Sequence, residues 1–274
     1  MTRLAGKVAL VTGGGRGIGL SLVQRLAAEG ARVVVNDLDA EPAEAAAKWV
    51  RDAGGEAIAY SGSVTGGDFA AGFIGAALSH FGDIHILVNN AGYVWNGPIH
   101  KIGDAQWDAM QEVHLKAPFR ILRELHGFLE PRAKQERAAG TVLHRKVVNV
   151  SSVAATSGTA GQVNYSAAKA GLHGLTKSLA KEWGPLAVNV NCVAFGYIDT
   201  RLTREISGET VVMIEGEARR VGLTRPLIEA IKARVALGRS GTPGEAAGGV
   251  LLFCLPESDY ITGQILDVDG GLAN

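Results

Sequence analysis

The sequence has few cysteines and no paired spacing of metal ligands. Cys192 and Cys254 are the two cysteines in 274 residues, and the seven histidines form no HxxxH arrangement. Disulfide frameworks and zinc sites both need repeated, closely spaced ligands, so we expect no disulfide and no metal site. Two free thiols are typical of a reducing compartment, which predicts a cytoplasmic protein.

Long hydrophobic runs are also missing. The longest apolar stretch, near Ala246 to Leu255, is too short to span a bilayer. The segment from Met1 to Leu10 enters a strand-like run almost at once and lacks the apolar core and cleavage site of a signal peptide. We therefore expect a soluble protein with no membrane segment.

Neither sign of charge is in excess. The chain has 27 basic and 27 acidic side chains, and the basic residues form no stripe with interleaved aromatics. Nucleic-acid binding usually requires a basic surplus that neutralises phosphates, so we expect no nucleic-acid partner. The hydrophobic fraction of 47% is enough for a sizeable core.

Short β-branched runs alternate with longer Ala/Leu-rich amphipathic segments, which predicts an α/β fold. The expected strands are Val8–Val11, Arg32–Asn36, Glu56–Tyr60, Ile84–Val88, Lys146–Val150, Ala187–Val193 and Ile265–Val268. The expected helices are Ile18–Glu29, Glu41–Ala53, Gly67–Phe81, Asp104–Glu130, Asn164–Trp183 and Pro243–Leu255. This alternation favours a parallel sheet covered by helices on both faces. No linker or internal repeat divides the chain, so we expect one domain over residues 1–274.

Two segments interrupt the alternation. Residues 131–145 are polar and charged, which predicts a solvated loop. Residues 201–239 contain two expected helices, Thr203–Glu215 and Pro226–Ala236, and are predicted to form a lid over a substrate. The alternative for this second segment is an ordinary amphipathic helix pair on the surface.

A glycine-rich turn joins the first strand to the first helix. Its glycines are Gly13, Gly17 and Gly19, a spacing that differs from GxGxxG. Glycine lets backbone N–H groups approach a diphosphate closely, and the helix N-terminus adds partial positive charge. The turn therefore indicates a nucleotide site, with a simple tight turn as the alternative.

An acidic residue, Asp37, ends the second strand. A carboxylate there can accept hydrogen bonds from an adenosine ribose and would repel a 2′-phosphate. Arg16 favours NADP instead, because a guanidinium can pair with the 2′-phosphate. We predict NAD rather than NADP, and the alternative role for Asp37 is to cap the next helix.

Tyr165 and Lys169 are separated by one helical turn, so their side chains share a face. A nearby ammonium favours phenolate, which predicts a lowered pKa for Tyr165 and a role as general acid or base. Ser152 follows the fifth strand, where its hydroxyl could hold a substrate oxygen. The alternative is a chance YxxxK pair on the surface.

With these motifs in order, the sequence resembles a short-chain dehydrogenase/reductase. The family's TGxxxGxG is present as Thr12–Gly19, its NNAG as Asn89–Gly92, and its serine and YxxxK as Ser152, Tyr165 and Lys169. Asn189–Gly196 resembles the NxVxPG segment, and residues 261–264 with 267–271 resemble the family's C-terminal end. The match extends over nearly the whole chain.

The resemblance implies a three-layer Rossmann fold with a seven-stranded parallel sheet in the order 3-2-1-4-5-6-7. It implies a homodimer or homotetramer and Ser152, Tyr165 and Lys169 as the catalytic residues. The residues expected to contact the dinucleotide are Gly13, Arg16, Gly17, Ile18, Gly19, Asp37, Val64, Asn90, Ala91, Gly92, Tyr165, Lys169, Gly196, Ile198 and Thr200.

Three positions depart from the family's pattern. His114 stands where the family has an asparagine that supports a proton-relay water, and it either takes over the relay or is a helix histidine bonded to a backbone carbonyl. Phe195 replaces a proline before Gly196, and Ser63 replaces an aspartate after the third strand. The last change weakens an expected adenine contact.

The expected function is hydride transfer between a nicotinamide cofactor and a carbonyl or secondary alcohol. The pattern most resembles 3-oxoacyl-[acyl-carrier-protein] reductases and 3-hydroxyacyl dehydrogenases, so the expected substrate is an acyl thioester. An alcohol, polyol or steroid dehydrogenase is the alternative. A different class, a dinucleotide-binding protein without catalysis, also stays open.

Overall fold

Seven of the short apolar runs form one parallel sheet in the computed structural model, which describes residues 2–201, 203–205, 211–214, 217–220 and 222–273. From edge to edge, the strands are β3 (Ala57–Ser61), β2 (Arg32–Asp37), β1 (Val8–Val11), β4 (Ile86–Asn89), β5 (Arg145–Ser152), β6 (Val188–Phe195) and β9 (Ile265–Val268). Counted along the chain, this is the predicted order 3-2-1-4-5-6-7, which is confirmed.

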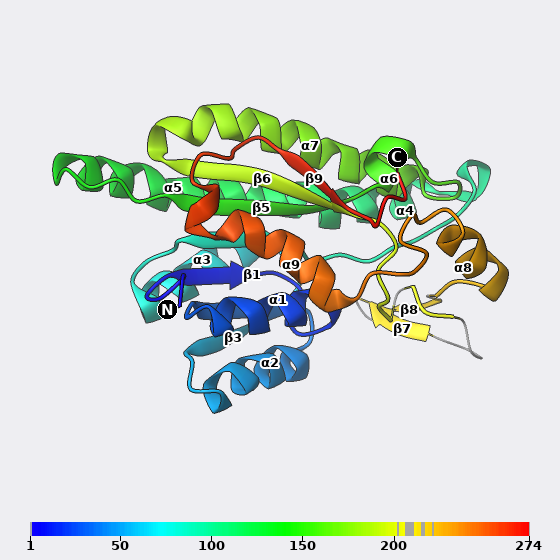
Figure 1. The fold of residues 1–274 in the computed structure, drawn as a ribbon, viewed down its shortest axis with the longest axis horizontal. Helices are drawn as coiled ribbons and strands as arrows, with labels where there is room; N and C mark the ends of the chain where they lie inside the picture. Colours follow the sequence, from blue (N-terminus) through cyan, green and yellow to red (C-terminus); the bar gives the residue numbers. More distant parts are fainter. Residues whose placement is uncertain (1, 202, 206–210, 215–216, 221, 274) are drawn as a thin grey trace.

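Helices cover both faces of the sheet because its strands alternate apolar side chains between two cores. On β2, Val33 and Val35 pack into one core, whereas Val34 packs into the other. The first core holds α1 (Gly17–Ala28), α2 (Ala40–Asp52) and α9 (Pro243–Cys254), and the second holds α3 (Phe69–Phe81), α5 (Ala117–Ala138) and α7 (Val163–Trp183). Figure 1 shows these layers, with α5 and α7 on one side of the sheet and α1 and α2 on the other.

The helix predicted over Asp104–Glu130 has a π-helical turn in its middle. α4 (Asp104–Gln111) continues through η2 (Glu112–Lys116) into α5. One-turn π segments are uncommon inside helices and are frequent at functional sites. Here the turn contains His114, one of the departures from the family's pattern.

The solvated loop predicted over residues 131–145 is confirmed only for residues 139–144, which form the connection between α5 and β5. α5 continues through Pro131 to Ala138, and Arg145 is the first residue of β5 with only 2% of its surface exposed. Arg145, at the end of this segment, forms ion pairs with Glu136 at 2.8 Å and with Asp83 at 3.2 Å. The polarity of Arg145 therefore reflects pairing, whereas the other charged residues of the segment are exposed or half-buried.

The segment over residues 201–239 is only partly helical. Its second expected helix is present in shorter form as α8 (Arg225–Lys232). Residues 211–214 of the first expected helix instead form β7 (Val211–Ile214), which pairs antiparallel with β8 (Glu217–Arg220), and residues 206–210 and 215 lie outside the described residues. Figure 1 shows α8 and this hairpin beyond the carboxyl ends of the strands.

Short elements complete the fold. They are η1 (Ile99–Lys101), α6 (Ala154–Ser157), η3 (Gly184–Leu186) and η4 (Pro256–Ser258). Among the described helices, none is long and apolar enough to cross a membrane. Cys192, Cys254 and Trp183 are buried.

Candidate active site

The glycine-rich turn between β1 and α1 is packed too tightly for side chains. A Cβ on Gly13, where φ is +63°, would lie 2.9 Å from the Cα of Ala91. A Cβ on Gly19 would lie 1.9 Å from the carbonyl oxygen of Gly13. The side-chain-free turn therefore brings its backbone against the end of β4.

The N-terminus of α1 has no side-chain cap. Arg16 occupies the N-cap position without a capping hydrogen bond. Gly17 has φ of +53°, and among the described residues a Cβ added there would meet only the Cγ2 of Thr200, at 4.0 Å. The first N–H groups of a helix have no partners within it, and the helix dipole favours anions there. This arrangement fits the diphosphate of a dinucleotide.

Asn90 and Thr12 fix the shape of this turn. The amide of Asn90 donates to the carbonyl oxygens of Thr12 at 2.9 Å and Gly13 at 3.1 Å. The hydroxyl of Thr12 in turn accepts from the backbone N–H groups of Asn90 and Ala91. The side chain of Asn90 thus holds the backbone of the glycine-rich turn in place.

Asp37 lies under the turn with 6% of its surface exposed. One carboxylate oxygen accepts from the N–H of Gly15 at 3.1 Å, and the other lies 3.4 Å from the guanidinium of Arg16. Arg16 also pairs with Asp39 at 2.7 Å, so its charge is shared between two carboxylates. The N-cap residue of α2 is Asp39, which makes no side-chain capping bond.

Ser152, Tyr165 and Lys169 meet at the carboxyl edge of the sheet. Ser152 ends β5, and the other two lie in the first turns of α7. Lys169 is 4% exposed, donates to the carbonyl oxygen of Val150 at 2.7 Å, and has its Nζ 5.7 Å from the centroid of the Tyr165 ring. The predicted clustering is therefore present.

The pKa of Tyr165 is not lowered, contrary to the prediction. Burial raises the pKa of Tyr165 to about 12, and a hydrogen bond with Ser152 only partly opposes the rise. Burial also lowers the pKa of Lys169 to about 8, with Cys192 opposing. The expectation of a lowered tyrosine pKa is wrong for this structure, because desolvation of the phenolate outweighs any nearby charge. Tyr165 is thus a protonated phenol, ready to donate.

His114 packs directly against Tyr165. Its ring meets the tyrosine ring edge to face at 5.0 Å, and its Nε2 lies 2.6 Å from the carbonyl oxygen of Tyr93. Burial, and then the charge of Lys169, hold the pKa of His114 well below its ordinary value, so the ring is neutral. Nε2 therefore donates to Tyr93, and Nδ1 is buried without a partner among the described residues.

The model of the short chain dehydrogenase family matches residues 7–210. The chain belongs to this family. Short-chain reductase protein NovJ of Streptomyces niveus is 37% identical over 96% of this chain and 93% of its own length. The 3-oxoacyl-[acyl-carrier-protein] reductase FabG of Vibrio cholerae is 35% identical over 98% of both chains.

A solved member of the family has the same fold. The gluconate 5-dehydrogenase of Burkholderia cenocepacia, in complex with NADP and tartrate, is 30% identical and superposes with a TM-score of 0.84. The superposition covers 99% of this chain and 96% of that one. This short-chain dehydrogenase is accordingly an NAD(P)-dependent oxidoreductase that acts on CH–OH groups.

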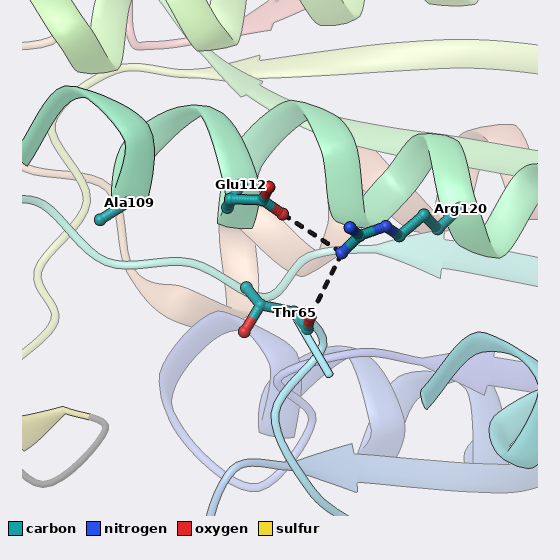
Figure 2. Close-up of a pocket in the computed structure, with 4 residues that line it drawn as sticks. All are labelled: Thr65, Ala109, Glu112 and Arg120. Atoms are coloured by element: carbon teal, nitrogen blue, oxygen red, sulfur yellow. Dashed lines mark hydrogen bonds and ion pairs between the residues drawn. The ribbon is translucent and has the colours of Figure 1, made fainter. Parts of the chain in front are cut away.

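Two hollows lie near the residues that follow β3 and β4. The smaller one is lined in part by Thr12, Val64 and Ala91, so two expected cofactor contacts are brought together. The larger, of about 320 Å³, is lined by Thr65, Ala109, Glu112 and Arg120. Figure 2 shows Arg120 bridging the carboxylate of Glu112 and the carbonyl oxygen of Thr65.

Sequence reasoning did not single out Glu112 or Arg120. Both lie in the helix interrupted by the π turn, and their pairing across 3.2 Å depends on that turn. A charged pair at a separation of eight residues is not a standard helical pairing, which is three or four residues apart. The sequence alone therefore carried no signal for them.

The loop after β6 carries the last expected contacts. A Cβ on Gly196 would lie 2.5 Å from the Cβ of Asp269, so a larger residue would displace the C-terminal segment. Ile198 is 5% exposed, and Thr200 reaches the start of α1 at Gly17. Phe195 is buried and accepts at its carbonyl oxygen from the N–H of Val153, which links this loop to the one after Ser152.

Proposed function

We propose that this short-chain dehydrogenase reduces 3-oxoacyl thioesters with NADH and, in reverse, oxidises 3-hydroxyacyl thioesters. The observation that carries the chemistry is the meeting of the partly buried Tyr165 with Ser152 and the buried Lys169 at the carboxyl edge of the sheet. The acyl substrate is supported by similarity to several FabG reductases over nearly the whole chain.

In the reducing direction, Ser152 donates a hydrogen bond to the carbonyl oxygen of the substrate. The nicotinamide supplies a hydride to the carbonyl carbon when it is bound. As negative charge develops on the oxygen, Tyr165 transfers its hydroxyl proton to it and the product is the alcohol. Lys169 stabilises the resulting phenolate and binds the nicotinamide ribose.

The dinucleotide would be bound by residues that follow the carboxyl ends of the strands. Gly13, Gly17, Ile18 and Gly19 would receive the diphosphate, and Ile198 and Thr200 would contact the nicotinamide side. The adenine side of the dinucleotide would contact Val64, Asn90, Ala91 and Gly92. Gly196 would allow the loop after β6 to lie close to the C-terminal segment at Asp269. These roles are what the resemblance to the family implies, and the close packing of the glycine turn and the hollow beside Val64 and Ala91 support them.

NAD is the proposed cofactor because Asp37 ends β2 with its carboxylate beneath the glycine turn. Arg16 is committed to Asp37 and Asp39, so a 2′-phosphate would have to compete with two carboxylates for it. The solved gluconate 5-dehydrogenase has NADP instead. Comparing NADH and NADPH at equal concentration tests the choice, and clearly faster turnover with NADPH would contradict it.

A sugar acid is the second candidate substrate. The structural similarity to gluconate 5-dehydrogenase favours it, and the lid proposed over residues 201–239 carries several arginines that could pair with a carboxylate. A panel of 3-oxoacyl thioesters, keto-sugar acids and simple ketones, followed by NADH consumption, separates the candidates. No turnover on any substrate would favour the non-catalytic alternative.

Tyr165→Phe is the sharpest test of the chemistry. The variant keeps the ring against His114 but loses the donated proton, so kcat should fall by about 10²- to 10⁴-fold. Dinucleotide binding, measured by fluorescence titration, should be retained. Tyr60→Phe is the control, since its hydroxyl packs against Gly72 on α3, away from the site. Near-normal turnover by Tyr165→Phe would remove the proposed role.

We also propose a cytoplasmic homodimer or homotetramer. Trp107 on α4 and Phe119 on α5 are 39% and 45% exposed on one continuous helix. Large aromatic side chains are enriched in subunit interfaces, which supports an oligomer. Light scattering during size-exclusion chromatography distinguishes monomer, dimer and tetramer.

A further inference from the structure

One guanidinium joins the turn after β3, residues 62–66, to the helix that contains the π turn. A single nitrogen of Arg120, in α5, donates to the backbone carbonyl oxygen of Thr65 and to a carboxylate oxygen of Glu112, at 3.2 Å in each case. Glu112 is the first residue of the π turn, and Figure 2 shows Arg120 between its two partners. Arg120 therefore fixes the distance between Thr65 and Glu112.

The chain neighbours of both partners line the smaller hollow. Val64 precedes Thr65 and Val113 follows Glu112, and both valines are buried in the wall of this hollow. The resemblance to the family places the adenine side of the dinucleotide at Val64. A shift of Thr65 relative to Glu112 would therefore move two walls of the hollow relative to each other.

Local bonds give the turn after β3 its shape. The hydroxyl of Ser63 lies 2.7 Å from that of Thr65, and the N–H of Gly66 donates to the carbonyl oxygen of Ser63 at 3.0 Å. Bonds between residues so close in sequence do not determine where the turn lies relative to a helix. The bond from Arg120 spans 55 residues of sequence, so it does determine that position.

The ion pair is accessible to solvent, which separates its role from folding. The side chains of Arg120 and Glu112 are 27% and 31% exposed. Pairs with this exposure contribute little to folding stability, so a variant without the guanidinium should fold. A contact that stabilises little can still control affinity, because a site that is correctly arranged for only a fraction of the time binds more weakly by that fraction.

We propose that Arg120 is a positioning residue that sets the affinity of this enzyme for the adenine half of the dinucleotide. It holds the turn after β3 against the helix and so keeps Val64 and Val113 in place beside the adenine. This role rests on the proposed function, because a dinucleotide must bind for it to matter. Arg120 acts through the turn and does not contact the reacting atoms.

Arg120→Met tests this role, because methionine keeps an aliphatic side chain but has no donor for Thr65. The dissociation constant of NADH, measured by its fluorescence, should rise about tenfold if the turn is then in place for a tenth of the time. The dissociation constant of ADP-ribose, which has the adenine half but no nicotinamide, should rise by the same factor. The KM for NADH should follow, and kcat at saturating NADH should be unchanged.

Arg120→Lys and Lys116→Met are the companion variants. An ammonium at position 120 can donate to both oxygens, so Arg120→Lys should recover most of the lost affinity. Lys116 also pairs with Glu112, from one helical turn away, whereas the bond to Thr65 comes from Arg120. Lys116→Met removes the same charge from the same helix, so it should leave both dissociation constants at their wild-type values.

Four outcomes decide the matter. Wild-type affinity for ADP-ribose in Arg120→Met would overturn the role. Equal losses in Arg120→Met and Lys116→Met would also overturn it, because charge rather than position would then explain them. A changed oligomeric state of Arg120→Met in light scattering, or a fall in kcat as large as the rise in the dissociation constant, would show a general structural role and overturn it too. Absence of turnover by the wild-type enzyme, with ADP-ribose affinity still dependent on Arg120, would instead overturn the proposed function.

Discussion

Lys146 and Lys169 are equally buried, yet only one of them has a carboxylate partner. Both are 4% exposed, but the Nζ of Lys146, at the amino end of β5, lies 2.7 Å from Asp259 and bonds Asn189 and Ser258 as well. Lys169, at the carboxyl edge, has the carbonyl oxygen of Val150 and no ion pair within the described part of the chain. Its pKa falls to about 8 as a result of burial.

The same contrast extends to the two edges of the sheet as a whole. At the amino edge, buried Arg145 pairs with Glu136 and Asp83. At the carboxyl edge, the partly buried Tyr165 has its pKa raised by desolvation, which a hydrogen bond with Ser152 opposes only in part. Buried ionisable groups with perturbed pKa values and few partners are typical of reactive sites. Buried charges that are paired have a structural role, because removing one partner destabilises the fold. Arg145 and Lys146 at the amino edge are thus in ion pairs, whereas Tyr165 and Lys169 at the carboxyl edge are in none among the described residues.

Replacing each lysine by methionine tests this difference between Lys146 and Lys169 with the largest expected effect. Lys169→Met should lower kcat by about 10²- to 10⁴-fold. It should leave the free energy of unfolding equal or higher, because an unpaired buried charge is removed. Lys146→Met should lower the free energy of unfolding by about 1–3 kcal/mol, since Asn189 and Ser258 lose a partner. Its kcat should be unchanged, and equal kcat losses in both variants would refute the separation of roles.

Arg145→Met probes the amino edge alone. Removing the guanidinium leaves Glu136 and Asp83 uncompensated, which should lower the free energy of unfolding by about 3–5 kcal/mol. Urea denaturation measures this change. Lys134→Met, which breaks an exposed pair with Glu130 on the same helix, should cost less than about 1 kcal/mol. Similar losses in the two variants would mean that burial of the pair is unimportant.

His85 makes the amino edge sensitive to acid. It accepts at Nδ1 from the N–H of Val8, and burial lowers its pKa to about 4 from 6.5. The unfolded chain therefore binds the proton first as pH falls, so stability present above pH 6.5 is lost on the way to pH 4, by at most about 3 kcal/mol. His85→Asn retains an acceptor near Val8 and cannot titrate. Its free energy of unfolding should change less than that of the wild type between these two pH values.

The strands were predictable because their signal is local. Val8–Val11 and Ile265–Val268 match the structure residue for residue, as a short apolar run bounded by turn residues implies. The meeting of Ser152, Tyr165 and Lys169 was also predictable, since strand ends and the spacing of one helical turn are local geometry. The order of the strands came from resemblance to the family.

The failures all depended on distant contacts. Residues 131–138 are helical rather than part of the predicted loop, and Arg145 is buried in a pair with Asp83, which lies far away in sequence. The pKa of Tyr165 is raised by desolvation, to which contacts from other elements such as His114 contribute, and no spacing within α7 reveals these contacts. The hairpin of β7 and β8 replaced an expected helix because pairing between strands competes with helical periodicity.

The π turn at 112–116 has a consequence for how this enzyme tolerates insertions and deletions. Relative to an α-helix, such a turn accommodates one additional residue, and each residue of an α-helix turns the chain by about 100°. Deleting a single residue there would restore a regular helix and rotate α4 relative to α5 by roughly that angle. His114 would then swing off Tyr165, although every side chain of the site had been inherited intact. Chain length at one helical turn is thus as much a part of the active site as residue identity.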